Sequence, residues 1–141
     1  VTYVKYGEKV YSPLVEKGEA DIIVAFEQLE ALRYLSYLKT TGEYIVSTQR
    51  IDPMPVITGK EKYPDEITQK LKATGASVRD VPALDLALQA GSSKAINTVL
   101  LGVMAKVSDI EKEKWLKALN ETVPEKFREL NQKAFELGYH Y

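Results

Sequence analysis

Four polar side chains stand where two short apolar runs of the sequence end: Glu27, Gln28, Thr48 and Gln49. The runs, Asp21–Phe26 and Glu43–Thr48, are rich in strand-forming residues and do not alternate, which predicts strands of a parallel sheet buried on both faces. Ligands of open α/β sheets bind beyond the carboxyl ends of the strands, so the four side chains could line one cleft. The alternative for Glu27 is structural, because an acidic residue there stabilises the N-terminus of the next helix through its dipole.

Two further candidates lie at the start of the most apolar segment, Ser92–Val107. Ser92 follows Gly91 and precedes Ser93-Lys94, so free backbone amides, hydroxyls and a lysine could receive a phosphate. The alternative is that Ser92 is an ordinary N-cap of the helix, which the same residues would also form. Asn97 lies on a helix that is otherwise nearly all apolar, where a buried amide must find partners. It either ties down a neighbouring loop or contacts a ligand, and we favour the structural role.

The residue types present exclude most metal-dependent and nucleophilic chemistry by this chain alone. It has no cysteine, so it cannot hold an iron–sulfur cluster by the usual thiolate ligation or use a cysteine nucleophile. Its one histidine, His140, is too few for a histidine-based zinc site. Thr58-Gly59-Lys60 is not a phosphate loop, because Met54 stands where that motif needs glycine and Glu61 follows the lysine. We therefore expect no catalytic residue and no metal ligand.

Composition indicates a single domain of ordinary surface character. The chain has 141 residues, 45% of them hydrophobic, with 19 basic against 20 acidic residues. No basic stripe stands out, so we expect no nucleic-acid binding. No apolar run approaches the length of a membrane span, and we expect a cytoplasmic domain that does not enter a membrane.

The order of the expected elements predicts an α/β fold with three layers and a mainly parallel sheet. A hairpin over Val1–Ser12 comes first, and a helical tail comes last. Between them we expect strands and helices at 21–26, 27–41, 43–48, 64–75, 76–81, 82–91 and 92–107, with an irregular loop over 51–62 that holds a short extended piece at Val56-Ile57. Ser108-Asp109-Ile110-Glu111 matches a capping box for the next helix, and Gly138 is expected to close the last one.

Five stretches, taken together and in order, resemble one known family. They are VYSPL (Val10–Leu14), GEADIIVAFEQLEALRYLSYLK (Gly18–Lys39), YIVSTQ (Tyr44–Gln49), NTVLLG (Asn97–Gly102) and VPEKFRELNQKAFELG (Val123–Gly138). In order and spacing the set is similar to the gamma subunit or domain of the 2-oxoacid:ferredoxin oxidoreductases, and most of all to the small subunit of the indolepyruvate type. The likeness runs from about Val4 to the end of the chain.

The resemblance implies a Rossmann-like fold and a helper role in a larger enzyme. The family's reaction is oxidative decarboxylation of a 2-oxoacid, in which coenzyme A captures the acyl group and ferredoxin receives the electrons. Thiamine diphosphate and iron–sulfur clusters are expected on a large partner subunit, and the resemblance implies that this chain assists by helping to bind coenzyme A. The rival hypothesis is a stand-alone regulatory α/β domain that binds a nucleotide or a ligand like coenzyme A.

The resemblance also bears on the start of the chain. Members of the family begin with a strand and a turn of Gly-x-Gly-Gly-Gln-Gly type, followed by a Ser-x-Arg-Gly-Gly stretch that leads into the strand found here near Val1. Neither motif occurs in this sequence. We therefore expect residues 1–141 to form one gamma-type domain that lacks the family's first strand or strands.

Overall fold

A three-stranded parallel sheet is the centre of the molecule, in a computed structural model that describes all residues, 1–141. The strands are β1 (Ala20–Ala25), β2 (Leu38–Ser47) and β3 (Ser77–Val81), in the order β1-β2-β3. Both pairs are parallel, with Val24 opposite Ile45 and Ile45 opposite Arg79. The predicted parallel strands are confirmed.

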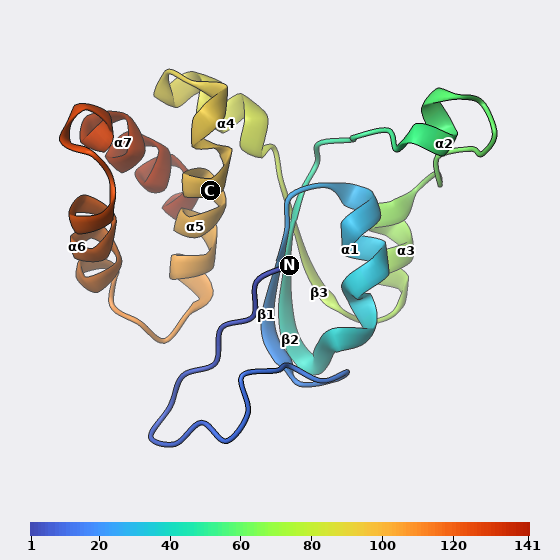
Figure 1. The fold of residues 1–141 in the computed structure, drawn as a ribbon, viewed down its shortest axis with the longest axis horizontal. Coiled ribbons are helices and arrows are strands. Elements are labelled where there is room, and N and C mark those ends of the chain that lie inside the picture. Colours follow the sequence, from blue (N-terminus) through green and yellow to red (C-terminus); the bar gives the residue numbers. More distant parts are fainter.

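Helices cover both faces of this sheet, so the predicted three-layer α/β fold is confirmed (Figure 1). They are α1 (Gln28–Tyr34), α2 (Met54–Ile57), α3 (Ile67–Ala73), α4 (Ala83–Ala90), α5 (Ile96–Val107), α6 (Lys112–Thr122) and α7 (Arg128–Tyr139). Helices α1 and α3 lie on one face, whereas α4, α5 and α7 lie on the other. Helix α6 packs outside α5 and α7, and α2 stands apart on a projecting loop. No helix is both long enough and apolar enough to cross a membrane.

The central strand β2 supplies side chains to both cores. Ile45 packs among residues of α4 and α5, including Ala87 and Val99. Its neighbours Tyr44 and Val46 point to the opposite face and pack with residues of α1 and α3. All three strand residues are buried, which is why this strand reads as a continuous apolar run in the sequence.

Two glycines let helices α5 and α7 touch backbone to backbone. A Cβ on Gly138 would lie 1.9 Å from the carbonyl oxygen of Val99, and a Cβ on Gly102 would lie 2.2 Å from that of Phe135. Helix α7 ends at Tyr139, one residue later than predicted, so Gly138 is its penultimate residue. Its position is fixed by the closeness of two helices, a property that only the tertiary structure defines.

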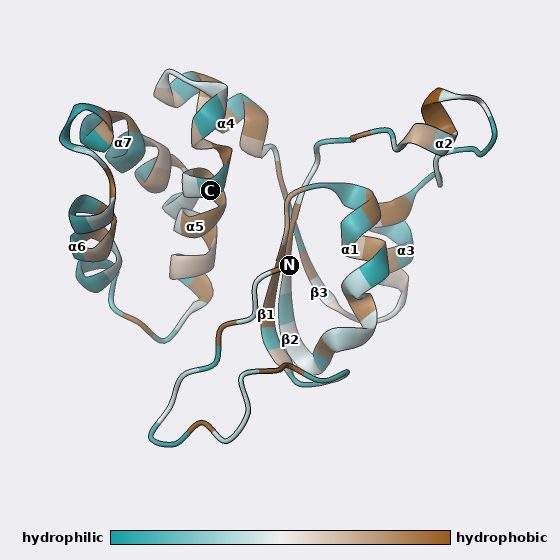
Figure 2. Cartoon of the chain, in the orientation of Figure 1, coloured by the Kyte–Doolittle hydropathy of each residue, from teal (hydrophilic) through white to brown (hydrophobic).

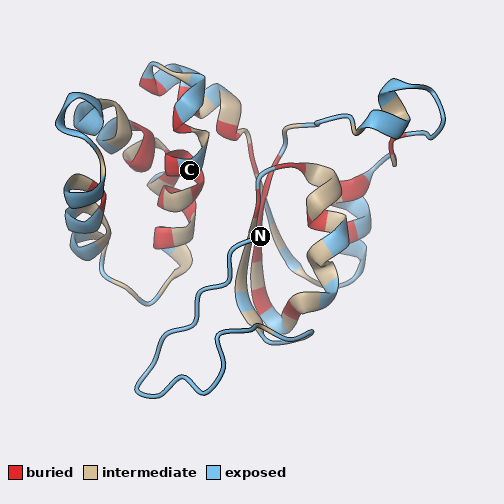
Figure 3. Cartoon of the chain, in the orientation of Figure 1, coloured by how far each residue is buried: buried red, intermediate tan, exposed pale blue.

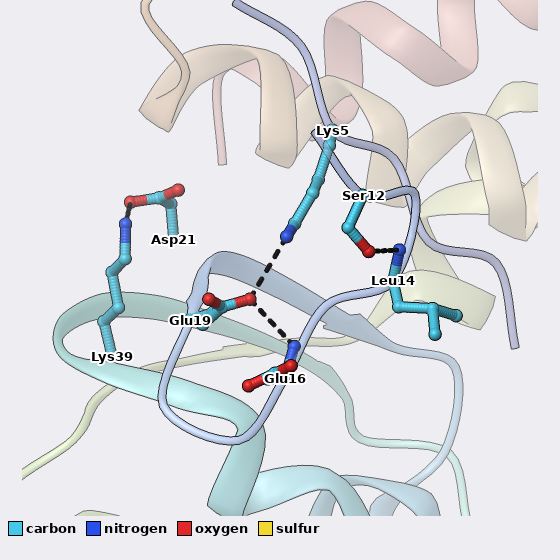
Figure 4. A network of polar contacts seen from close by, with 7 residues as sticks. All are labelled: Lys5, Ser12, Leu14, Glu16, Glu19, Asp21 and Lys39. Atoms are coloured by element: carbon cyan, nitrogen blue, oxygen red, sulfur yellow. Dashed lines mark hydrogen bonds and ion pairs between the residues drawn. The ribbon is translucent and has the colours of Figure 1, made fainter. Parts of the chain in front are cut away.

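The N-terminal hairpin expected over Val1–Ser12 was wrong. Residues 1–19 form no strand, and nearly all of them are exposed (Figure 3). Polar contacts hold the segment in place: Lys5 pairs with Glu19 at 3.1 Å (Figure 4), and the Tyr6 hydroxyl donates to Asp109 at 2.8 Å. A two-stranded hairpin is marginal without further strands to pair with, and residues 1–12 pair with none.

Three local predictions also need correction. Strand β2 begins at Leu38, so the preceding helix does not run on to residue 41, and a short 3-10 turn separates the two. Val56-Ile57 is helical rather than extended, because Pro53 and Met54 start a closed turn. Ser108 does not form a capping box: its hydroxyl accepts from Ile110 N and Trp115 Nε1 instead.

Candidate functional site

The structure brings together the four residues that follow β1 and β2. The backbone N–H of Gln28 donates to the Gln49 carbonyl at 3.3 Å, and the Gln28 side-chain amide donates to the Thr48 carbonyl at 2.9 Å. A bond from Thr48 N to the Val81 carbonyl, at 2.9 Å, ties this edge to the end of β3. The predicted neighbourhood therefore exists, while a ligand role for these residues stays a prediction.

Glu27 serves the structure of this edge. It is only 8% exposed and has an extended backbone. Its Oε1 accepts from Glu30 N at 2.7 Å and its Oε2 from Leu29 N at 2.9 Å, so the carboxylate caps helix α1. The Tyr63 hydroxyl donates to the same Oε2 at 3.2 Å. These contacts support the structural alternative for Glu27.

Tyr63 is the residue at this edge that the sequence analysis missed. It is buried, and the guanidinium of Arg50 lies 4.2 Å from the centre of its ring. Burial, and then the negative charge of Glu27, raise the pKa of Tyr63 to about 12. Tyr63 lies 36 positions from Glu27, and no local pattern connects residues so far apart in the chain.

The side chains of Thr48 and Gln49 form no hydrogen bond within the chain. Thr48 is exposed and Gln49 is half-buried, and both are held by their backbone atoms: Gln49 N donates to the Ser47 hydroxyl at 3.3 Å. A hydroxyl and an amide can donate and accept hydrogen bonds, but neither is an acid or a base near neutral pH. This edge is therefore suited to binding a polar ligand, and it offers no nucleophile paired with a base.

Ser92 and Asn97 lie apart from these four residues, with no hydrogen bond joining them to the edge. The Ser92 hydroxyl accepts from Lys94 N at 3.2 Å, so Ser92 forms the ordinary serine N-cap that was the alternative to a phosphate site. Asn97 is exposed, so the expectation of a buried amide was wrong. The buried polar residue is its neighbour Thr98, whose hydroxyl donates to Asn131 Oδ1 at 2.6 Å.

Two cavities lie away from the predicted cleft. One of about 390 Å³ lies between α4 and α7 and is lined in part by Leu86, Leu137 and His140. The other, of about 340 Å³, lies at the amino ends of β2 and β3, beside Leu38 and Gly75. None of the six candidate residues lines either cavity. No group of three or more His, Asp or Glu side chains is placed to hold a metal ion.

The fold is a parallel α/β domain, and the free side chains at the carboxyl edge of its sheet are those of Thr48 and Gln49. A sequence model of the family described as pyruvate ferredoxin/flavodoxin oxidoreductase matches residues 1–141. The chain belongs to that family.

Individual relatives agree with this assignment. The chain is 35% identical over 143 residues to indolepyruvate oxidoreductase subunit IorB of Thermococcus kodakarensis, covering 98% of this chain and 71% of that protein. It is 36% identical over 141 residues to the subunit of the same name from Archaeoglobus fulgidus, covering 97% and 70%.

The solved gamma subunit of a keto/oxoacid ferredoxin oxidoreductase from Geobacter sulfurreducens has a similar structure. The TM-score is 0.65 and the identity 26%, over 87% of this chain. This chain spans 64% of the length of that gamma subunit. The resemblance found in the sequence is thus confirmed at the level of family and fold.

Proposed function

We propose that this chain acts as the small, gamma-type subunit of a 2-oxoacid:ferredoxin oxidoreductase of the indolepyruvate or arylpyruvate kind, with residues 1–141 as one domain. The observation that carries the proposal is the family match over the whole chain, together with relatives that are named as indolepyruvate oxidoreductase subunits. The fold of a gamma subunit, shared with the bacterial structure, supports the same role.

The residues of this chain define its share of the work. Without a cysteine it cannot ligate an iron–sulfur cluster by thiolates, so the clusters belong on a large partner subunit, together with thiamine diphosphate. Those groups supply decarboxylation and electron transfer to ferredoxin. This chain supplies binding surface, and we assign the free Thr48 hydroxyl and Gln49 amide to hydrogen bonds with polar groups of coenzyme A.

Isolation of the protein from its own host tests the proposal. The tagged chain is purified gently, its native mass is measured, and the chains that accompany it are identified. We expect a much larger chain that carries iron and thiamine diphosphate, and an activity with arylpyruvates that requires coenzyme A. A lone monomer or homodimer would contradict the proposal and favour the stand-alone regulatory domain. A cytoplasmic location is part of the proposal, and fractionation of the host tests it.

A further inference from the structure

Phe26 is an exposed aromatic residue at the carboxyl end of β1, where the candidate cleft begins. It directly follows Ala25, the last residue of that strand, and it is 51% exposed. The strand itself lies between the two layers of helices, and Figure 2 shows hydrophobic residues along it. Phe26 therefore continues an apolar strand to the point where it leaves the core, and it presents a flat apolar surface there.

The alternation of side chains along β1 determines the face to which Phe26 points. Successive side chains of an extended chain lie on opposite faces of its sheet. Ala25 packs in the core with α1 and α3, and Glu27, whose backbone is extended, bonds to Tyr63 of the same core. Phe26 stands between these two residues, so its side chain points to the opposite face, which α4 and α5 cover.

The same rule places Gln49 on that face. Ile45 packs against α4 and α5, and Gln49 follows it by four residues. Arg50, the next residue, lies on the ring of Tyr63 and so belongs to the face of α1 and α3. The backbone N–H of Gln28 donates to the Gln49 carbonyl at 3.3 Å, which keeps Gln49 beside the end of β1. Phe26 and Gln49 are thus neighbours at one edge and on one face of the sheet.

An aromatic ring beside a free carboxamide is suited to an adenine ring. Nucleobases stack on aromatic side chains. A glutamine carboxamide can donate to N7 of adenine and accept from its N6 amino group at the same time. The Gln49 carboxamide forms no hydrogen bond within the chain, so both of its polar atoms are free for this pairing.

The charges of the edge argue against a phosphate group at the same place. Phe26 and Gln49 are uncharged, and Arg50 is paired with Asp52 at 2.6 Å and packs on the other face. These residues offer a phosphate no free cation, whereas adenine is neutral and needs none. The pantetheine part of coenzyme A has no flat ring, so adenine is the one group of that ligand that can stack on Phe26.

We propose that Phe26 and Gln49 hold the adenine ring of coenzyme A, with the ring stacked on Phe26 and its N6–N7 edge bonded to Gln49. The inference rests on the proposed function, which supplies coenzyme A as the ligand. It names the part of coenzyme A that this chain recognises, and it leaves the phosphate groups and the thiol to other parts of the complex.

The test measures how tightly the purified complex binds coenzyme A and 4′-phosphopantetheine, which lacks the adenine nucleotide. We expect Phe26→Ala to weaken coenzyme A binding by roughly 10-fold or more, the usual effect of losing a stacked base, and to leave 4′-phosphopantetheine binding unchanged. Phe26→Trp keeps a ring for stacking and should bind coenzyme A as well as the unmodified complex does. Phe127→Ala is the matched control, because Phe127 is 45% exposed and lies just before α7, away from this edge.

A second variant tests the Gln49 contact separately. A coenzyme A analogue with hypoxanthine in place of adenine carries an oxygen where adenine has its amino group. The unmodified complex should prefer coenzyme A over this analogue, and Gln49→Leu should bind the two equally. Thermal unfolding of each variant checks that it is folded, and the preference for adenine remains a test if Phe26→Ala does not fold.

The outcomes separate the two proposals. Coenzyme A binding that Phe26→Ala leaves unchanged, or a preference for adenine that survives Gln49→Leu, overturns the adenine site and leaves the proposed function standing. Equal weakening of both ligands by Phe26→Ala, or failure of the folded variant to join the large subunit, also overturns the adenine site, because Phe26 then supports the site or the interface as a whole. Failure of the unmodified chain to accompany a large subunit overturns the proposed function itself, and the adenine site with it.

Discussion

Replacement of Gly138 by alanine tests whether the contact between α5 and α7 is as close as the structure shows. The new Cβ would lie 1.9 Å from the Val99 carbonyl oxygen, where ordinary contacts begin at 3.4 Å, so the helices must separate locally by 1.5 Å (3.4 minus 1.9). The obstructing atoms are backbone and cannot rotate away. Overpacking of this kind costs about 3 kcal/mol, at the upper end of its usual range. Alanine's higher helix propensity offsets about 1 kcal/mol.

The expected net loss is about 2 kcal/mol in the free energy of unfolding. For a chain of this length that loss lowers the Tm by roughly 8 °C. Urea unfolding, followed by circular dichroism and by the fluorescence of Trp115, measures it. Lys133→Ala is the matched control, because it places the same residue at an exposed position of the same helix and is expected to change stability little. A Gly138→Ala protein as stable as the unmodified chain would refute the reasoning.

Three other predictions concern the sheet edge. Glu27→Ala removes the cap of α1 and lowers the free energy of unfolding by about 1–2 kcal/mol, measured by urea unfolding at pH 7. The pKa of Tyr63 is about 12 in the fold, against 10.0 for an ordinary tyrosine, so the stability that its protonated hydroxyl contributes is intact below pH 10 and is lost as the pH rises toward 12. In unfolding curves measured from pH 8 to 12, the free energy of unfolding of Tyr63→Phe falls less steeply than that of the unmodified chain. We expect Gln49→Leu to weaken the binding of coenzyme A to the complex, measured by calorimetry, and Gln69→Leu, at an exposed position of α3, to leave it unchanged.

Burial patterns made the layered part of the fold predictable. The runs that became β1 and β2 read as apolar without alternation because helices cover both faces of the sheet. In the helix expected over 64–75, Ile67 and Leu71 lie four residues apart, as an inner stripe requires, and both are fully buried. Gly75, expected at the end of that helix, has a φ of +84°, which glycine adopts without strain. Each of these features depends on residues close together in the sequence.

Features that depend on distant residues were not predictable. Residues 1–12 have the composition of a hairpin, but a strand needs a neighbour to pair with, and composition does not reveal whether one is present. Asn97 and Thr98 are adjacent on one helix, and which of them faces inward depends on where α7 packs. The sequence analysis named Asn97 as the buried amide that must find partners, whereas the structure buries Thr98 and exposes Asn97.

The same division applies to the candidate site. The rule that parallel strands end at one edge correctly placed Gln28 beside Thr48 and Gln49. It said nothing of Tyr63 and Arg50, which reach this edge from the segment between β2 and α3. The carboxylate of Glu27 illustrates the limit most clearly, because its residue type suits chemistry while its hydrogen bonds to Leu29 and Glu30 commit it to structure.

Because the Glu27 carboxylate is occupied in capping α1, the remaining groups of the edge determine how this chain can affect the kinetic constants of the complex. The groups left free at the edge, the Thr48 hydroxyl and the Gln49 amide, can contact a ligand only by neutral hydrogen bonds and transfer no proton at neutral pH. Hydrogen bonds to a part of coenzyme A remote from its reacting thiol act on the ground state and the transition state alike, so their loss raises KM without lowering kcat. In the assembled complex, Gln49→Leu should therefore raise the KM for coenzyme A and leave kcat unchanged. A fall in kcat at saturating coenzyme A would show instead that this edge takes part in the chemical step.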